Sequence, residues 1–164
     1  MRISRDQWAM GLAKLTSARS TCLRRAVGCV LLNARGHVLA TGYNGVAAGM
    51  PHCNEQTGTV LHADEPITEQ SWTPIYRHAC AGHAAPSGQS LDACQAIHAE
   101  QNALLQCRDV AQIFSVYVTA SPCMTCTKLL LNTGCQNIFY AEEYPHSAAK
   151  DLWLAAGRTW TQIS

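Results

Sequence analysis

The feature that most constrains this chain is a pair of short motifs in its C-terminal half, His98-Ala99-Glu100 and Pro122-Cys123-Met124-Thr125-Cys126. Together they supply one imidazole and two thiolates, which zinc prefers as ligands, and one carboxylate that is not needed as a ligand. Three protein ligands leave one tetrahedral position for water, as in a catalytic zinc site. We therefore expect the two motifs to lie at adjacent helix starts.

The spacing within each motif suggests how its residues act. Cys123 and Cys126 are three residues apart, so they share one face of a helix, and Pro122 suits the first turn of that helix. Glu100 follows His98 by two residues, a separation at which side chains point apart inside a helix, so we expect a helix start that faces a pocket. Glu100 would then carry protons between water and substrate as a general acid and base.

Two other interpretations of the cysteines remain open. A structural zinc ribbon would use four protein ligands, and Cys123 with Cys126 could also form a redox pair. Neither interpretation accounts for the carboxylate of Glu100 beside His98.

Composition favours a compact enzyme that acts on a small substrate. The 164 residues, 48% apolar and 14% charged, suit a single domain over 1–164 with a substantial core. A net charge near +1 argues against a nucleic-acid partner, because such domains carry a strong basic excess. No apolar run is long enough for a membrane span, and residues 1–8 lack a signal-peptide core, so we expect a cytoplasmic protein with no membrane partner.

Hydrophobic periodicity predicts alternating helices and strands. The first helix, over residues 5–19, should place Trp8, Leu12 and Leu15 on one face. The turn signal at residues 33–36 predicts a hairpin between the first two strands. We expect strands at 27–32, 37–42, 113–119, 137–141 and 159–163, with further helices at 98–107, 122–131 and 147–156. Strands separated by helices of this length imply a mixed sheet covered by helices.

Further segments accompany the zinc motifs, at residues 19–28, 41–45, 51–53, 86–88, 98–103, 117–119 and 121–123. With these segments the chain resembles the deoxycytidylate (dCMP) deaminase family of the cytidine deaminase superfamily. The resemblance implies a three-layer α/β/α cytidine deaminase-like fold with a mixed five-stranded sheet, and zinc-dependent hydrolysis of dCMP to dUMP. It also implies a homo-oligomer, with a hexamer favoured, that is activated by dCTP and inhibited by dTTP, each bound with Mg²⁺.

A long inserted segment, at about 54–90, departs from the compact form of that family. Some similar enzymes carry a second, structural zinc, and Cys22, Cys53 and Cys94 match three of its ligands. We favour Cys80 as the fourth ligand, with His83 next. The alternative is that these cysteines are ordinary buried thiols.

The same resemblance suggests residues that contact the nucleotide. Asn44 matches a position that holds the sugar hydroxyl, although Asn is also common in turns. The cluster of Arg19, Arg24 and Arg25 is the best candidate for the 5′-phosphate, unless it is a solvated face or a subunit interface. Tyr144 resembles a tyrosine near the nucleotide, with burial in the core as the alternative.

The turn that contains Gly42, Tyr43 and Gly45 lies where similar enzymes bind a triphosphate effector. Two other functions stay open from the sequence. One is deamination of another cytosine nucleotide or of a nucleic-acid base, and the other is a zinc-binding scaffold without catalysis.

Overall fold

The computed structural model describes residues 1–57, 77–78, 80, 82, 84–86, 89, 94–145 and 147–163. Its centre is a five-stranded sheet in the order β2-β1-β5-β6-β7. The strands are β1 (Gly28–Leu32), β2 (Val38–Tyr43), β5 (Ser115–Ala120), β6 (Asn137–Glu142) and β7 (Thr159–Gln162). β1 pairs antiparallel with β2 and β5, whereas β5, β6 and β7 run parallel, so the predicted mixed sheet is confirmed.

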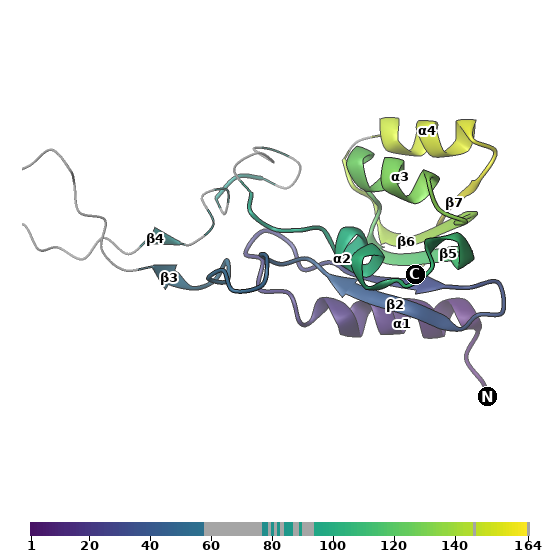
Figure 1. The fold of residues 1–164 in the computed structure, drawn as a ribbon, viewed down its shortest axis with the longest axis horizontal. Coiled ribbons are helices and arrows are strands. Elements are labelled where there is room, and N and C mark those ends of the chain that lie inside the picture. The colour runs from purple at the N-terminus through teal and green to yellow at the C-terminus, as the bar shows by residue number, and fades with distance from the viewer. Residues whose placement is uncertain are drawn as a thin grey trace, which may run out of the picture.

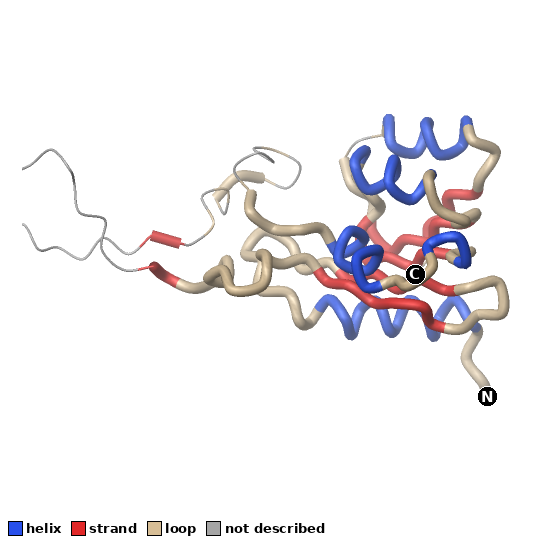
Figure 2. The backbone as a smooth tube through the Cα atoms, viewed as in Figure 1, coloured by secondary structure: helices blue, strands red, loops and turns tan. Residues whose placement is uncertain are grey.

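Helices cover both faces of this sheet (Figure 1). One face packs against α1 (Arg5–Ser17), and the other lies beneath α2 (Ala99–Gln106), α3 (Met124–Leu131) and α4 (Ala148–Ala155). Figure 2 shows the same layers, with helices on both sides of the strands. The predicted three-layer α/β/α architecture is therefore confirmed.

The alternation of side chains along β1 explains why both faces are buried. Cys29 and Leu31 belong to the core cluster beneath α2, α3 and α4, whereas Val30 and Leu32 belong to the cluster that packs on α1. A strand that is apolar at every position can serve two cores, since successive side chains point to opposite faces. All five residues of β1 are buried accordingly.

The buried face of α1 differs from the prediction. The helix buries Ala9, Met10 and Ala13, whereas Trp8 is 38% exposed and Leu15 is 72% exposed. The reason is the close approach of α1 to β1, where a Cβ at Gly28 would lie 2.0 Å from the carbonyl oxygen of Ala13. The small side chains of Ala9 and Ala13 allow this approach, and Met10 is buried with them, whereas Trp8 and Leu15 are left outside.

The inserted segment contains a short element that the sequence did not predict. Two-residue strands β3 (Gln56–Thr57) and β4 (Arg77–His78) pair antiparallel to one side of the main sheet (Figure 1). A 3₁₀ turn, η2 (Val110–Gln112), precedes β5. Among the described residues, no helix is both long enough and apolar enough to cross a membrane.

Candidate active site

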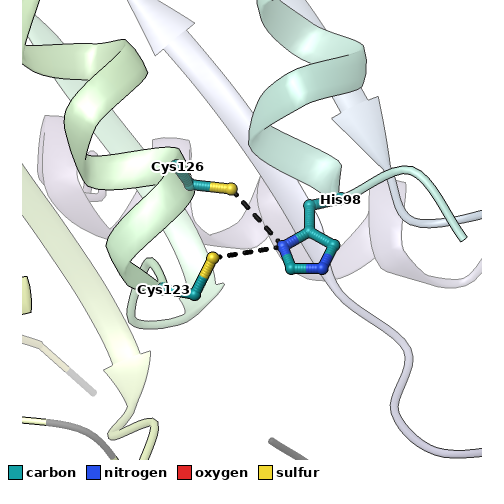
Figure 3. A group of neighbouring side chains, drawn as sticks. All are labelled: His98, Cys123 and Cys126. Carbon is teal, nitrogen blue, oxygen red and sulfur yellow. Dashed lines mark hydrogen bonds between the residues drawn. The ribbon is translucent and has the colours of Figure 1, made fainter. Parts of the chain in front are cut away.

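The two zinc motifs meet at the starts of two neighbouring helices. His98 is the N-cap of α2, Cys123 is the N-cap of α3, and Cys126 lies in the first turn of α3. The Nδ1 atom of His98 lies 3.4 Å from the Sγ atom of each cysteine, and Figure 3 shows the imidazole facing both sulfurs. The predicted meeting of two helix starts is thus observed.

Local backbone structure brings these helix starts together. Ile97, just before His98, forms a two-way backbone bridge with Gly45 at the end of β2, with N···O distances of 2.8 and 3.1 Å. Cys123 follows closely on the end of β5, which lies beside β1 in the sheet. Pro122 was predicted within the first helical turn, but α3 begins at Met124, so the proline precedes the N-cap and shapes the entry of the chain.

The donor set fits a zinc ion. Among the described residues, the group of His98, Cys123 and Cys126 is the one in which all ligand atoms lie within 4.8 Å of one another. The hydrogen bond from the Cys126 thiol, together with one from His98, outweighs burial and lowers the pKa of Cys123 to about 4. One imidazole and two sulfurs match the ligands of a catalytic zinc with a fourth position left over.

Glu100 lies beside this group and is only 4% exposed. Burial raises the pKa of its carboxyl group to about 7, and a hydrogen bond with its own backbone, followed by the nearby His98, only partly opposes this effect. A carboxyl group with such a pKa can both accept and return a proton near neutral pH. Such a pKa is expected of a residue that carries protons during catalysis, which is the role predicted for Glu100.

A pocket opens in front of the metal ligands and collects most of the predicted substrate residues. Its lining includes Glu100, Arg24, Arg25, Asn44 and Tyr144, together with His98 and Cys123. Arg24 and Arg25 each have a buried Nη1 atom without a hydrogen-bond partner among the described residues. Arg19, the third member of the predicted cluster, is exposed and does not line this pocket.

Asn44 is 8% exposed and holds the segment that carries the arginines. Its Oδ1 atom accepts hydrogen bonds from the Val27 amide at 2.8 Å and the Ser20 hydroxyl at 2.7 Å. Its Nδ2 atom donates to the carbonyl oxygen of Arg25 at 2.8 Å. An amide nitrogen has two hydrogens, so one remains for a ligand.

Tyr144 is half-buried and lines the pocket together with Cys123 and the two arginines. Burial, followed by proximity to Cys123, raises the pKa of its phenol, while Arg24 and Arg25 act in the opposite direction. Its backbone amide donates to the Ser121 hydroxyl at 2.7 Å, which ties Tyr144 to the loop that carries Cys123. This role of Ser121 was not predicted, although the residue directly precedes the Pro-Cys-x-x-Cys motif.

The four cysteines predicted for a second zinc interact with one another. Cys53 and Cys80 are 1% and 2% exposed. Burial, followed by proximity to Cys80, Cys22 and Cys94, raises the pKa of Cys53 to about 12. The Cys80 thiol is hydrogen-bonded with Cys53 and Cys94. The cluster is looser than the first one, because no three of its sulfurs all lie within 4.8 Å of one another. The alternative ligand, His83, lies outside the described residues.

A second cavity, of about 670 Å³, lies beside the turn after β2. Tyr43 and Gly45 line it, along with His52, Glu55 and Asn102. Gly42, which was predicted with them, is not part of the lining and instead packs against the backbone of α2.

Comparison with known proteins agrees with this geometry. The family model described as the cytidine and deoxycytidylate deaminase zinc-binding region matches residues 3–142. The deoxycytidylate deaminase of Mycobacterium phage D29 is 32% identical over 84% of this chain and 94% of its own length. That of Schizosaccharomyces pombe is 34% identical over 95% of this chain, which spans only 43% of the yeast protein.

A solved structure shares the fold. The dCMP deaminase of the cyanophage S-TIM5, crystallised in complex with dCMP and dUMP, superimposes with a TM-score of 0.65 at 24% identity, covering 98% of each chain. The family match over residues 3–142 includes the metal ligands, Glu100 and the arginines of the pocket. This chain therefore belongs to the family of zinc-binding cytidine and deoxycytidylate deaminases.

Proposed function

We propose that this protein catalyses the hydrolytic deamination of dCMP to dUMP. The observation that carries the proposal is the convergence of His98, Cys123 and Cys126 beside the buried Glu100, in a pocket that also contains two arginines. Relatives that are about a third identical to the chain are named deoxycytidylate deaminases, which supports dCMP as the substrate.

The chemistry follows from the residues of the pocket. His98, Cys123 and Cys126 would hold a zinc ion, which would lower the pKa of a water molecule and so supply the nucleophile. Glu100 takes up the proton that the water gives up and delivers it to the pyrimidine ring nitrogen. It then moves the proton of the newly added hydroxyl group to the amino group, which leaves as ammonia. The overall reaction replaces the exocyclic amino group by the oxygen of water. Burial raises the pKa of Glu100 to about 7, in the pH range in which both proton transfers are efficient.

Recognition of a monophosphate is assigned to Arg24 and Arg25. A buried guanidinium nitrogen without a partner favours an anion, since an unmade hydrogen bond costs roughly 1–3 kcal/mol. Asn44 retains one amide hydrogen for the sugar, and Tyr144 lines the same pocket as the arginines and the metal group. Arg19 is left out of this proposal, because it is exposed outside the pocket.

A second zinc ion, held by Cys22, Cys53, Cys80 and Cys94, is also proposed. The mutual interaction of the thiols and the burial of Cys53 and Cys80 support it. Such an ion would fasten the inserted segment to the pocket, because Cys22 and Cys94 line the pocket as well. Free thiols throughout the chain also suit a cytoplasmic location, where thiols stay reduced.

Regulation by triphosphates is assigned to the second cavity. Its volume of about 670 Å³ is within the range of sites for small ligands. Tyr43 and Gly45 line it, and Glu55 could help to bind Mg²⁺ with dCTP or dTTP. Gly42 contributes only by allowing α2 to lie close. We further propose a homo-oligomer, with a hexamer favoured, that transmits the effect between subunits.

The test is a measurement of ammonia release from dCMP, CMP, dCTP, deoxycytidine and a short single-stranded oligonucleotide. We expect dCMP to be the best substrate by kcat/KM. A charged hydrogen bond contributes roughly 1.5–3 kcal/mol, so dCMP should exceed deoxycytidine by about 10- to 150-fold. A preference for deoxycytidine or for the oligonucleotide would overturn the proposal.

A further inference from the structure

The two arginines of the pocket are each held at one end. Arg24 donates from Nη2 to the carbonyl oxygens of Pro86 and Gln89, in the inserted segment. Arg25 donates from Nη2 to the carboxylate of Glu142 at 2.8 Å. In both residues Nη1 is the buried atom that lacks a partner among the described residues. One end of each guanidinium group is thus occupied, and the buried other end has an unmade hydrogen bond within the described part of the chain.

Glu142 is presented from a rigid part of the sheet. It ends β6, and its carbonyl oxygen accepts a hydrogen bond from the Ser121 amide at 2.8 Å. Ser121 in turn binds the backbone of Tyr144 and precedes the metal-binding loop. The carboxylate that holds Arg25 therefore has a fixed backbone position relative to the metal group.

Arg25 and Glu142 differ in their exposure to solvent. The side chain of Arg25 is 29% exposed, and that of Glu142 is 69% exposed. The carboxylate lies mostly in solvent, where its negative charge is screened and opposes a phosphate only weakly. Its hydrogen bond nevertheless restricts the long side chain of Arg25 before the nucleotide binds. Without that bond, the side chain would lose its conformational freedom on binding, at a cost in affinity.

We propose that Glu142 is a positioning residue for recognition of the 5′-phosphate. Its carboxylate occupies Nη2 of Arg25 and leaves the buried Nη1 for a phosphate oxygen. The inference rests on the proposed deamination of dCMP. It predicts that Glu142 affects nucleotides with a 5′-phosphate and leaves the corresponding nucleosides unaffected.

The experiment compares three variants of the zinc-loaded protein. Glu142→Ala removes the hydrogen bond and the charge, whereas Glu142→Gln removes the charge and keeps an acceptor. Glu143→Ala is the matched control, because this neighbouring carboxylate is exposed and forms no ion pair within the described part of the chain. For each protein we would measure kcat and KM with dCMP and deoxycytidine, and calorimetric binding of dUMP and deoxyuridine.

We expect Glu142→Ala to raise the KM for dCMP and weaken dUMP binding by about 2- to 5-fold, the range of an exposed ion pair. The kcat value and all nucleoside parameters should stay unchanged, Glu142→Gln should recover most of the loss, and Glu143→Ala should match the wild type. A Glu142→Ala protein that binds dUMP as well as the wild type, or better, would overturn the inference. Equal losses for dUMP and deoxyuridine would also overturn it, since they would indicate a structural role. Wild-type protein that neither deaminates dCMP nor binds dUMP would instead refute the proposed function.

Discussion

Gly42 lies directly beneath the first turn of α2, where a Cβ atom would be only 2.3 Å from the carbonyl oxygen of Ala99. The same Cβ would lie 2.4 Å from the amide nitrogen of Ala103. Both neighbours are backbone atoms, which cannot rotate away as a flexible side chain can. The contact allows β2 and α2 to approach closely, and α2 carries His98 at its N-cap and Glu100 in its first turn.

Gly42→Ala should therefore displace α2 and disturb the metal site. We expect a loss of at least about 1–3 kcal/mol in the free energy of unfolding, the range of overpacked cores, and weaker zinc binding. Gly11→Ala is the control, because Gly11 lies in the middle of α1 with nothing within 4 Å of its Cβ position. That variant should gain about 0.4–1 kcal/mol. Denaturant titration and zinc competition would measure both, and a Gly42→Ala protein with wild-type stability would contradict the geometry.

Glu100→Gln should keep the catalytic zinc and lose activity. The amide preserves the size of the side chain but cannot accept and return a proton, so kcat should fall by roughly 10²–10⁴-fold. Elemental analysis of the variant would verify that zinc is retained. Glu143→Gln, which changes the net charge equally at an exposed position, should leave kcat unchanged. Near-normal turnover by a zinc-loaded Glu100→Gln protein would rule out the assigned role.

The resemblance to dCMP deaminases implied the family and the three-layer fold, and the zinc motifs and the alternation of helices and strands could be predicted from the residues themselves. The buried face of α1 could not. Periodicity favoured the large side chains of Trp8 and Leu15, but the close approach of Ala13 to Gly28 decided the packing. That approach depends on tertiary structure, which overrides the local pattern.

Contacts between residues far apart in the chain could not be predicted from the sequence either. No local signal pairs Arg25 with Glu142, which are 117 residues apart in the chain. The same holds for Asn44, whose side chain ties together Ser20, Arg25 and Val27. The tight turn predicted around Asn44 is not observed, because Gly42 and Tyr43 belong to β2 and Gly45 forms a bridge with Ile97. The partners of Asn44 became evident only in the folded chain.

Removal of one thiol should test the second metal site. Freshly purified protein that has not been exposed to a chelator should contain about two zinc ions per chain, since the two proposed sites are separate. Cys53→Ser should lower that count to about one and destabilise the fold. Cys107→Ser is the control, because the Cys107 thiol donates to the carbonyl oxygen of Asp109 and belongs to neither proposed zinc site. One zinc ion per chain in the wild type would contradict a second site.

The second cavity should decide the response to effectors. A ligand shifts an equilibrium only through different affinities for two states, so dCTP with Mg²⁺ should turn a sigmoidal dCMP saturation curve toward a hyperbolic one. dTTP should act in the opposite direction, with a coupling free energy of about 1–3 kcal/mol. His52→Ala, within the lining of this cavity, should weaken both responses and leave kcat unchanged. His37→Ala, at an exposed site beside the hairpin turn and outside the cavity lining, should respond like the wild type. Hyperbolic kinetics that millimolar triphosphates leave unaltered would show that the cavity has no regulatory role.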